Sequence, residues 1–121
     1  MKKILVVDDE PDVANLMKLF LNSLGYDTDI FPSCEDSLAA VMEEKYWAVF
    51  CDYLMPKTTG DKLFNIIRSA DEELAKRFVI ITGAVLDEKL DVFLKGEDVK
   101  VINKPFKLDE IRNILMEFEK I

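Results

Sequence analysis

Two kinds of apolar pattern alternate along the chain. Short, mostly apolar runs at positions 3–7, 27–31, 46–51, 78–82 and 99–102 are typical of strands. Longer segments between them carry apolar residues three or four positions apart, which is the spacing of an amphipathic helix. Regular alternation of strands and helices predicts an α/β fold built around a parallel sheet.

The first two predicted helices have recognisable ends. The first stops at Gly25, a residue type that readily adopts the left-handed conformation of a C-terminal cap. Ser33, followed three residues later by Asp36, resembles a capping box and opens a helix that reaches about Lys45. The apolar residues expected to face the sheet are Val13, Met17, Phe20, Leu21 and Leu24 in the first helix, and Leu38, Val41 and Met42 in the second.

Three further segments have helical spacing, at residues 60–69, 87–96 and 108–120. The first of them carries Leu63, Phe64 and Ile67 on its predicted inner face. Five helices connecting five strands predict a doubly wound five-stranded parallel sheet, with helices on both faces.

Composition and charge narrow the possible functions. A chain of 121 residues suits a single domain, and its net charge of −8 argues against a surface that neutralises many phosphates. No apolar run approaches the ~20 residues of a membrane span, and the basic start "MKK" precedes only four apolar residues, too few for a signal peptide. We therefore expect a cytoplasmic protein that contacts neither nucleic acid nor a membrane directly.

The cysteine and histidine content excludes several kinds of chemistry. Cys34 and Cys51 lack CxxC spacing, so we interpret them as reduced thiols that pack in the interior. The absence of histidine excludes Ser-His-Asp and Cys-His catalysis, zinc sites that use histidine, and a role as a phosphohistidine donor. Any chemistry must depend on carboxylates, lysine, threonine and backbone groups.

Polar residues follow four of the five predicted strands. Ligands of such sheets bind outside the carboxyl ends of the strands, so these residues are expected to form one site. The site would contain three carboxylates, a hydroxyl and an ammonium. Its members, in chain order, are Asp8 and Asp9 after the first strand, Asp52 after the third, Thr82 at the end of the fourth, and Asn103 with Lys104 after the fifth.

This set of residues suits a hard cation and a phosphoryl group. Mg²⁺ characteristically takes one or two carboxylates together with waters and a phosphate, and it would relieve the repulsion among Asp8, Asp9 and Asp52. The Asp52 carboxylate can then serve as a covalent nucleophile toward phosphorus. Lys104 and the Thr82 hydroxyl would contact the oxygens of the transferred group.

Each of these residues also has an ordinary explanation. The acids after the first strand can cap the next helix. Asp52 can be a loop acid, Lys104 a solvated lysine, and Thr82 simply the end of a strand. It is their coincidence at the strand ends that favours a functional site.

Four motifs, in this order and at these separations, resemble the receiver domain of bacterial two-component response regulators over essentially the whole chain. They are "VVDDE", "CDYLMPKTTG", "VIITGA" and "NKPF". The resemblance implies the flavodoxin-like receiver fold. It also implies specific roles: Asp52 as phosphoacceptor, Asp8 and Asp9 as the acidic pair serving Mg²⁺, the Leu54 carbonyl as a further metal ligand, Thr82 as the switch hydroxyl, and Lys104 as the phosphate-binding lysine.

The resemblance further implies partners and a mode of action. A histidine kinase or a histidine phosphotransfer protein would donate the phosphoryl group to Asp52, and a downstream effector protein would recognise the changed surface. Such a phosphoacceptor catalyses only its own phosphorylation and dephosphorylation, so the chain is not expected to be an enzyme with a separate substrate. A cis peptide bond before Pro105 is also usual in the family.

One position departs from the family pattern. The switch aromatic, usually Tyr or Phe three residues before the lysine, is Val101 here, which questions the usual coupling of a rotating ring to Thr82. The stretch "FLKGEDVKVINKPF" is more similar to receivers of hybrid histidine kinases. We expect a single receiver domain over residues 1–121 without an output domain, either a stand-alone regulator or a receiver excised from such a kinase.

Two other functions compete with this interpretation. A haloacid-dehalogenase-type phosphohydrolase also uses an aspartate nucleophile and Mg²⁺, but it needs a D-x-D motif. The second position after Asp8 is Glu10, and the second after Asp52 is Leu54. A phosphorylation-independent interaction module with a vestigial site is disfavoured by the intact acids, Thr82 and Lys104.

Overall fold

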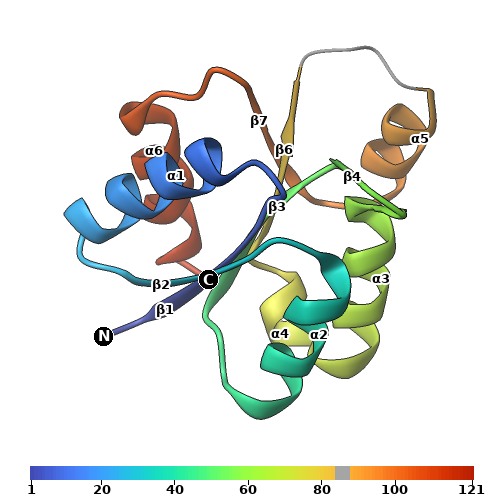
Figure 1. Cartoon of the computed structure of the whole chain (residues 1–121), viewed down its shortest axis with the longest axis horizontal. Helices are drawn as coiled ribbons and strands as arrows, with labels where there is room; N and C mark the ends of the chain where they lie inside the picture. The colour runs from blue at the N-terminus through green and yellow to red at the C-terminus, as the bar shows by residue number, and fades with distance from the viewer. Residues whose placement is uncertain (84–87) are drawn as a thin grey trace.

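The computed structural model describes residues 1–83 and 88–121 of the chain (Figure 1). Five parallel strands form the central sheet in the order β2-β1-β3-β6-β7. Their bounds are β1 Lys3–Val7, β2 Asp27–Phe31, β3 Ala48–Asp52, β6 Phe78–Thr82 and β7 Lys100–Asn103. The predicted α/β fold with a doubly wound five-stranded parallel sheet is therefore confirmed.

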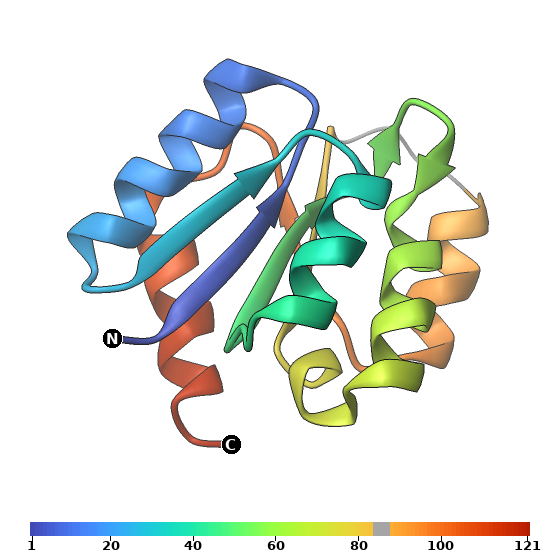
Figure 2. The same ribbon diagram turned by 60° about the horizontal axis from the view of Figure 1, so that its bottom comes forward.

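Helices cover both faces of the sheet. Figure 2 shows α1 (Pro11–Ser23) and α6 (Leu108–Phe118) on one face, and α2 (Cys34–Glu43), α3 (Gly60–Ala70) and α5 (Glu88–Gly96) on the other. The short helix α4 (Glu72–Ala75) joins α3 to β6. Because both faces are covered, the central strands have no solvent-facing side, which explains why their apolar runs lack polar interruptions.

Alternate residues of β1 supply two separate hydrophobic clusters, as the period-two geometry of a strand requires. Ile4 and Val6 pack in the cluster with α1 and α6, whereas Leu5 and Val7 pack in the cluster with α3 and α5. All four side chains are fully buried. The core thus consists of two layers, one on each face of the sheet.

The predicted end of the first helix is confirmed. Helix α1 has Leu24 as its C-cap, and Gly25 follows with φ +95°, a conformation that glycine adopts without steric cost. Met17 and Leu21 are fully buried, which agrees with the predicted inner face. Helix α1 therefore packs on the sheet in the predicted orientation.

The second helix follows its predicted start but not its whole predicted inner face. Helix α2 begins at Cys34, with the Ser33 hydroxyl accepting a hydrogen bond from the Asp36 N–H at 3.2 Å. It ends at Glu43, about two residues earlier than predicted. Met42, predicted to face inward, is 78% exposed, because it lies in the last turn at the margin of the packed surface.

Three short elements, one helix and two strands, were not predicted. The described residues form six helices instead of five, since α4 adds one turn in which the Asp71 carboxylate accepts a hydrogen bond from the Leu74 N–H at 3.1 Å. Strands β4 (Leu54–Met55) and β5 (Thr58–Thr59) form a two-stranded antiparallel hairpin between β3 and α3. Elements this short carry too few residues to show a hydrophobic period.

Two expectations from composition can be compared with the structure. Cys34 and Cys51 are free thiols and both are buried, as predicted. Within residues 1–83 and 88–121, helices of the length and apolar character needed to cross a membrane are absent.

Candidate functional site

Two buried aspartates lie side by side at the carboxyl edge of the sheet. Strands β1 and β3 are neighbours, and Val7 pairs with Cys51 in their register. Val7 is followed by Asp8 and Cys51 by Asp52, so the two aspartates are neighbours. Asp8 is only 2% exposed and Asp52 only 4%. Buried carboxylates are uncommon unless a cation or several hydrogen bonds compensate them.

The side chain of Lys104 reaches both aspartates from the loop after β7. Its Nζ lies 3.2 Å from Asp52 Oδ2 and 3.8 Å from Asp8 Oδ2, and it also lies 3.1 Å from Glu10 Oε1. The backbone N–H of Lys104 donates to the Thr82 carbonyl at 2.8 Å, which ties this loop to the end of β6. The structure therefore brings together Asp8, Asp52 and Lys104, as the sequence predicted.

Asp8 has one satisfied oxygen and one unsatisfied oxygen. Its Oδ1 accepts a hydrogen bond from the Glu10 backbone N–H at 2.9 Å. Its Oδ2 is buried and has no hydrogen-bond partner among the described residues. Burial raises the pKa of Asp8 above its ordinary value, although the Glu10 N–H and Lys104 act against that rise. A buried carboxylate oxygen without a hydrogen bond, with an ammonium only as near as 3.8 Å, is well suited to bind a cation.

The pKa of Asp52 is raised well above the ordinary value of an aspartate. Burial raises its pKa from 3.8 to about 6, and the neighbouring charge of Asp8 adds to the rise. Lys104 lowers the pKa by its charge and its hydrogen bond, but not enough to offset the other two causes. Near neutral pH the carboxylate is ionised in surroundings that hold too little positive charge, a condition that a bound cation would correct.

The Lys104 ammonium is the positive charge that partly compensates this cluster. Burial disfavours its charged form, but the hydrogen bond to Glu10 and the charges of Asp52 and Asp8 outweigh burial and raise its pKa. Lys104 is therefore protonated at neutral pH. It presents a fixed positive charge beside Asp52.

The carboxylates that converge are not the three that the sequence predicted. One oxygen each from Asp8, Glu10 and Asp52 lies within 4.8 Å of the others, close enough to hold one metal ion. Asp9 is exposed and lies outside this group, so its role as a metal ligand stays a prediction. Sequence reasoning named Glu10 only as a neighbouring acid, because spacing does not reveal which side chains of a loop turn toward Lys104.

Thr82 and Leu54 lie where the strand and hairpin ends place them. Thr82 is partly buried and pairs with Asn103 in the register of β6 and β7. The Leu54 side chain is exposed on the hairpin directly after Asp52. A metal contact from its carbonyl and a phosphate contact from the Thr82 hydroxyl stay predictions. The peptide bond between Lys104 and Pro105 is cis, as expected.

Gly60 lets the hairpin close against the end of β3. Its N–H donates to the Tyr53 carbonyl at 2.8 Å. A Cβ atom at this position would lie 2.9 Å from Ile80 Cδ1 and 3.0 Å from the Asp52 carbonyl oxygen, both closer than normal contacts. A larger residue would therefore push α3 away from the strand that carries Asp52.

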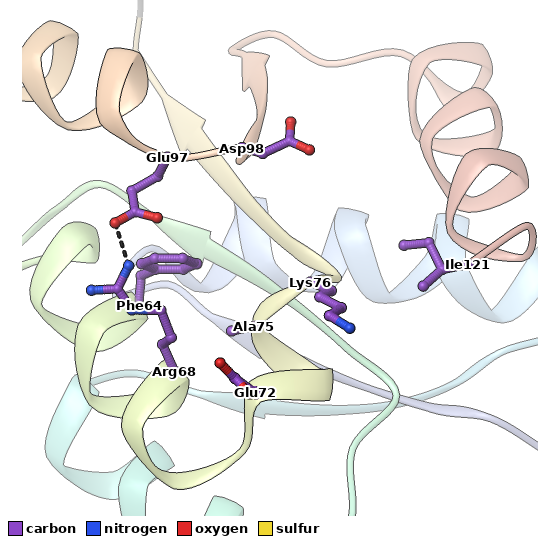
Figure 3. A pocket seen from close by; sticks show the side chains of 8 residues that line it. All are labelled: Phe64, Arg68, Glu72, Ala75, Lys76, Glu97, Asp98 and Ile121. Atoms are coloured by element: carbon purple, nitrogen blue, oxygen red, sulfur yellow. Dashed lines mark hydrogen bonds and ion pairs between the residues drawn. The ribbon is translucent and has the colours of Figure 1, made fainter.

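A separate pocket of about 460 Å³ lies at the opposite edge of the sheet, near the starts of β6 and β7 (Figure 3). Its charged residues have mixed signs, and Arg68 is already paired with Glu97. Phe64 forms part of its wall. Because this pocket brings together neither converging carboxylates nor a nucleophile beside a cation, the acidic group at the carboxyl edge is the better candidate site.

Doubly wound parallel sheets bind their ligands outside the carboxyl ends of the strands, which is where this chain places two buried carboxylates and a lysine. The sequence profile of the response regulator receiver domain matches residues 4–116. The chain therefore belongs to the receiver domain family of two-component response regulators, which is a family of signalling domains. The resemblance inferred from the four sequence motifs is confirmed.

Known relatives and solved structures agree with this assignment. Transcriptional regulatory protein RprY of Bacteroides fragilis is 30% identical over 110 residues, which cover 90% of this chain and 45% of that protein. A CheY-like receiver domain protein from Methanospirillum hungatei superposes with a TM-score of 0.88 over 99% of this chain and 95% of that one, at 22% identity. Response regulator protein TrrA of Thermotoga maritima, solved in complex with Mg²⁺-BeF, is 29% identical, with a TM-score of 0.84 over 98% of this chain and 99% of that one.

The chain spans about half the length of several curated relatives that it matches, such as RprY. Several of these relatives are transcriptional regulatory proteins. The expected organisation as a single domain without an output domain stays a prediction.

Proposed function

We propose that this receiver domain accepts a phosphoryl group on Asp52 in a Mg²⁺-dependent reaction and then changes the surface it presents to a partner. The observation that carries this proposal is the environment of Asp52. Its buried carboxylate lies beside Asp8 Oδ2, which accepts no hydrogen bond from the described residues, and 3.2 Å from the Lys104 ammonium. A carboxylate that can act as a nucleophile, a carboxylate oxygen suited to a cation and a positive charge thus lie close together.

The proposed step is a phosphoryl transfer. An Asp52 carboxylate oxygen forms a new bond to phosphorus while the bond from phosphorus to a histidine nitrogen of the donor breaks, and the imidazole leaves with the bonding electrons. The donor is a histidine kinase or a histidine phosphotransfer protein. Acetyl phosphate can replace it in the test tube, with acetate as the leaving group.

The residues of the chain have separate parts in this step. The candidates to hold Mg²⁺ are Asp8, Asp52, the Leu54 carbonyl, and either Asp9 or Glu10. When bound, the ion would neutralise developing charge on the phosphoryl oxygens. Lys104 would pair with one phosphoryl oxygen and give up its contact with Asp52. The Thr82 hydroxyl would donate to another oxygen and so transmit the modification to its loop.

The lifetime of the phosphorylated form depends on how well a water molecule is held in line with phosphorus. Polar side chains two positions after the phosphoacceptor and two after the switch hydroxyl would help to hold it, and these positions are Leu54 and Ala84 here. Ala84 lies outside the described residues. Because a leucine side chain cannot hydrogen-bond a water molecule, we expect phospho-Asp52 to be long-lived.

Intact-mass and peptide mass spectrometry after incubation with acetyl phosphate test the proposal. With Mg²⁺ present we expect one added phosphoryl group, located on Asp52. Asp52→Asn should abolish it, because an amide is a poor nucleophile. Labelling that persists on this variant, or that proceeds equally well in a metal chelator, would contradict the proposal.

A further inference from the structure

The proposed chemistry names Glu10 only as an alternative to Asp9 among the candidate metal ligands, but the contacts of its side chain point to another role. Glu10 is the N-cap of α1, but its carboxylate makes no capping hydrogen bond to that helix, all of whose residues are described. Its Oε1 instead accepts from Lys104 Nζ at 3.1 Å. The Glu10 side chain is 59% exposed and that of Lys104 only 19%, so Glu10 contacts the ammonium from the solvent side.

Lys104 contacts both buried and solvent-exposed carboxylates. Its Nζ lies 3.2 Å from Asp52 Oδ2 and 3.8 Å from Asp8 Oδ2, which are buried, and 3.1 Å from the exposed Glu10. The buried pair provides the oxygens best placed for a metal ion. An ammonium that rests on these oxygens repels an entering cation and competes with it for the same lone pairs. Glu10 offers the ammonium an alternative partner outside the buried pair.

We propose that Glu10 is a positioning residue that draws the Lys104 ammonium toward the mouth of the site and so leaves Asp8 and Asp52 available to the metal ion. This inference rests on the proposed function and deepens it. A half-exposed ion pair is weak, so Lys104 can later turn to a phosphoryl oxygen without a large barrier. Glu10 therefore acts on metal binding through Lys104 and not as a ligand.

A double-mutant cycle on Mg²⁺ affinity separates these two roles. The four proteins are the full chain, Glu10→Gln, Lys104→Met and the double variant, and backbone amide shifts follow the Mg²⁺ titration and report folding. Lys104→Gln replaces Lys104→Met if the latter does not fold. Asp12→Asn is the matched control, because Asp12 is an exposed acid in the first turn of α1 and its replacement removes the same charge.

Glu10→Gln should weaken Mg²⁺ binding by about two- to fivefold, the range expected for losing a partly exposed ion pair. Asp12→Asn should have a smaller effect. In the Lys104→Met background, Glu10→Gln should weaken binding no more than Asp12→Asn does, because the ammonium that Glu10 diverts is gone. The difference between the two backgrounds measures the coupling of Glu10 to Lys104.

Three results would overturn the inference. Equal weakening by Glu10→Gln in both backgrounds would make Glu10 a ligand or a general source of negative charge. An effect in the full chain no larger than that of Asp12→Asn would remove its specific role. A full chain that binds no Mg²⁺ would overturn both this inference and the metal-dependent part of the proposed function, whereas zero coupling in a protein that binds Mg²⁺ would overturn only the inference.

Discussion

The two edges of the sheet use charge in opposite ways. At the carboxyl edge, Asp8, Glu10 and Asp52 share one ammonium, and Asp8 Oδ2 has no hydrogen-bond partner among the described residues. At the amino edge, the residues that precede the strands pair their charges around Trp47. The carboxyl edge therefore has an excess of negative charge that a bound cation would neutralise, whereas the charges at the amino edge are already paired.

Trp47 is the centre of the amino edge. Its ring stacks on Tyr26 with centroids 5.3 Å apart, and Lys2 Nζ lies 4.7 Å from the ring centroid. Arg77 Nε donates to the Trp47 carbonyl at 2.6 Å, and Glu119 accepts hydrogen bonds from the Tyr26 hydroxyl and from Lys2. This cluster links the starts of β1, β2, β3 and β6 to the end of α6.

The comparison teaches that stability and function are concentrated at different ends of the same strands. An edge with paired charges and stacked rings contributes to stability, whereas an edge with surplus buried carboxylate costs stability until a ligand arrives. Substitutions at the two edges should therefore have opposite effects on the free energy of unfolding.

The largest expected effect on stability is at the amino edge. Trp47→Ala should lower the free energy of unfolding by about 3 kcal/mol, since it removes a large, partly buried ring together with the stacking contact between that ring and Tyr26. Chemical denaturation followed by circular dichroism measures the loss. Trp47→Phe, which keeps a ring, should lose less. Mg²⁺ affinity of the folded variants should not change, and a large change would break the separation between the two edges.

The next effect concerns metal binding at the carboxyl edge. Mg²⁺ at a hundredfold excess over its dissociation constant should stabilise the chain by about 2.7 kcal/mol, because it binds only the folded state. Thermal unfolding with Mg²⁺ and with a chelator measures this gain. Asp8→Asn should reduce it sharply, whereas Trp47→Phe should retain it. An equal gain in Asp8→Asn would place the metal elsewhere.

Without metal, Asp52→Asn should stabilise the protein at neutral pH by on the order of 2 kcal/mol, because it removes a carboxylate whose pKa is raised to about 6. The folded state binds this proton more tightly than the unfolded state does. The stability that protonated Asp52 contributes should therefore be lost as pH rises from about 4 through 6, and the raised pKa of Asp8 acts in the same direction.

Denaturation curves of parent and variant between pH 3 and pH 8 measure this dependence. The stability of Asp52→Asn relative to the parent should increase as pH rises through 6. A difference between variant and parent that does not increase over this window would contradict the account of an undercompensated buried carboxylate.

The smallest effect is on the lifetime of the phosphorylated form. Leu54→Asn should speed the loss of the phosphoryl group by on the order of tenfold, since an amide can hold a water molecule that leucine cannot. Decay of purified phosphoprotein in Mg²⁺ measures the rate, with Leu54→Met as the apolar control. If both variants decay at the same rate as the parent, the Leu54 side chain does not set the lifetime.

Most of the fold could be predicted from the sequence because its elements are long and periodic. All five parallel strands lie within two residues of their predicted positions, and Gly25 and Ser33 mark helix ends as expected. Helix α4 and the β4–β5 hairpin were missed, because they have four and two residues per element and are defined by local hydrogen bonds. No hydrophobic period extends over so few positions.

The site was predicted in outline but not in detail. The sequence predicted that Asp8 and Asp52 share the carboxyl edge, and the observed register of β1 and β3 makes them neighbours there. The choice between Asp9 and Glu10 depends on the turn between β1 and α1, where successive residues point in different directions. Spacing cannot reveal that Glu10 turns toward Lys104, nor that Asp8 Oδ2 accepts no hydrogen bond from the described residues.

A crystal structure of the chain with Mg²⁺ and beryllofluoride, a phosphoryl mimic, tests the central claim most directly. We predict a metal ion bound by Asp8 and Asp52, beryllofluoride attached to an Asp52 carboxylate oxygen, and the Lys104 ammonium in contact with a fluorine. A mimic attached to another carboxylate, or a metal ion bound away from Asp8 and Asp52, would contradict the assignment of the carboxyl edge as the phosphoacceptor site.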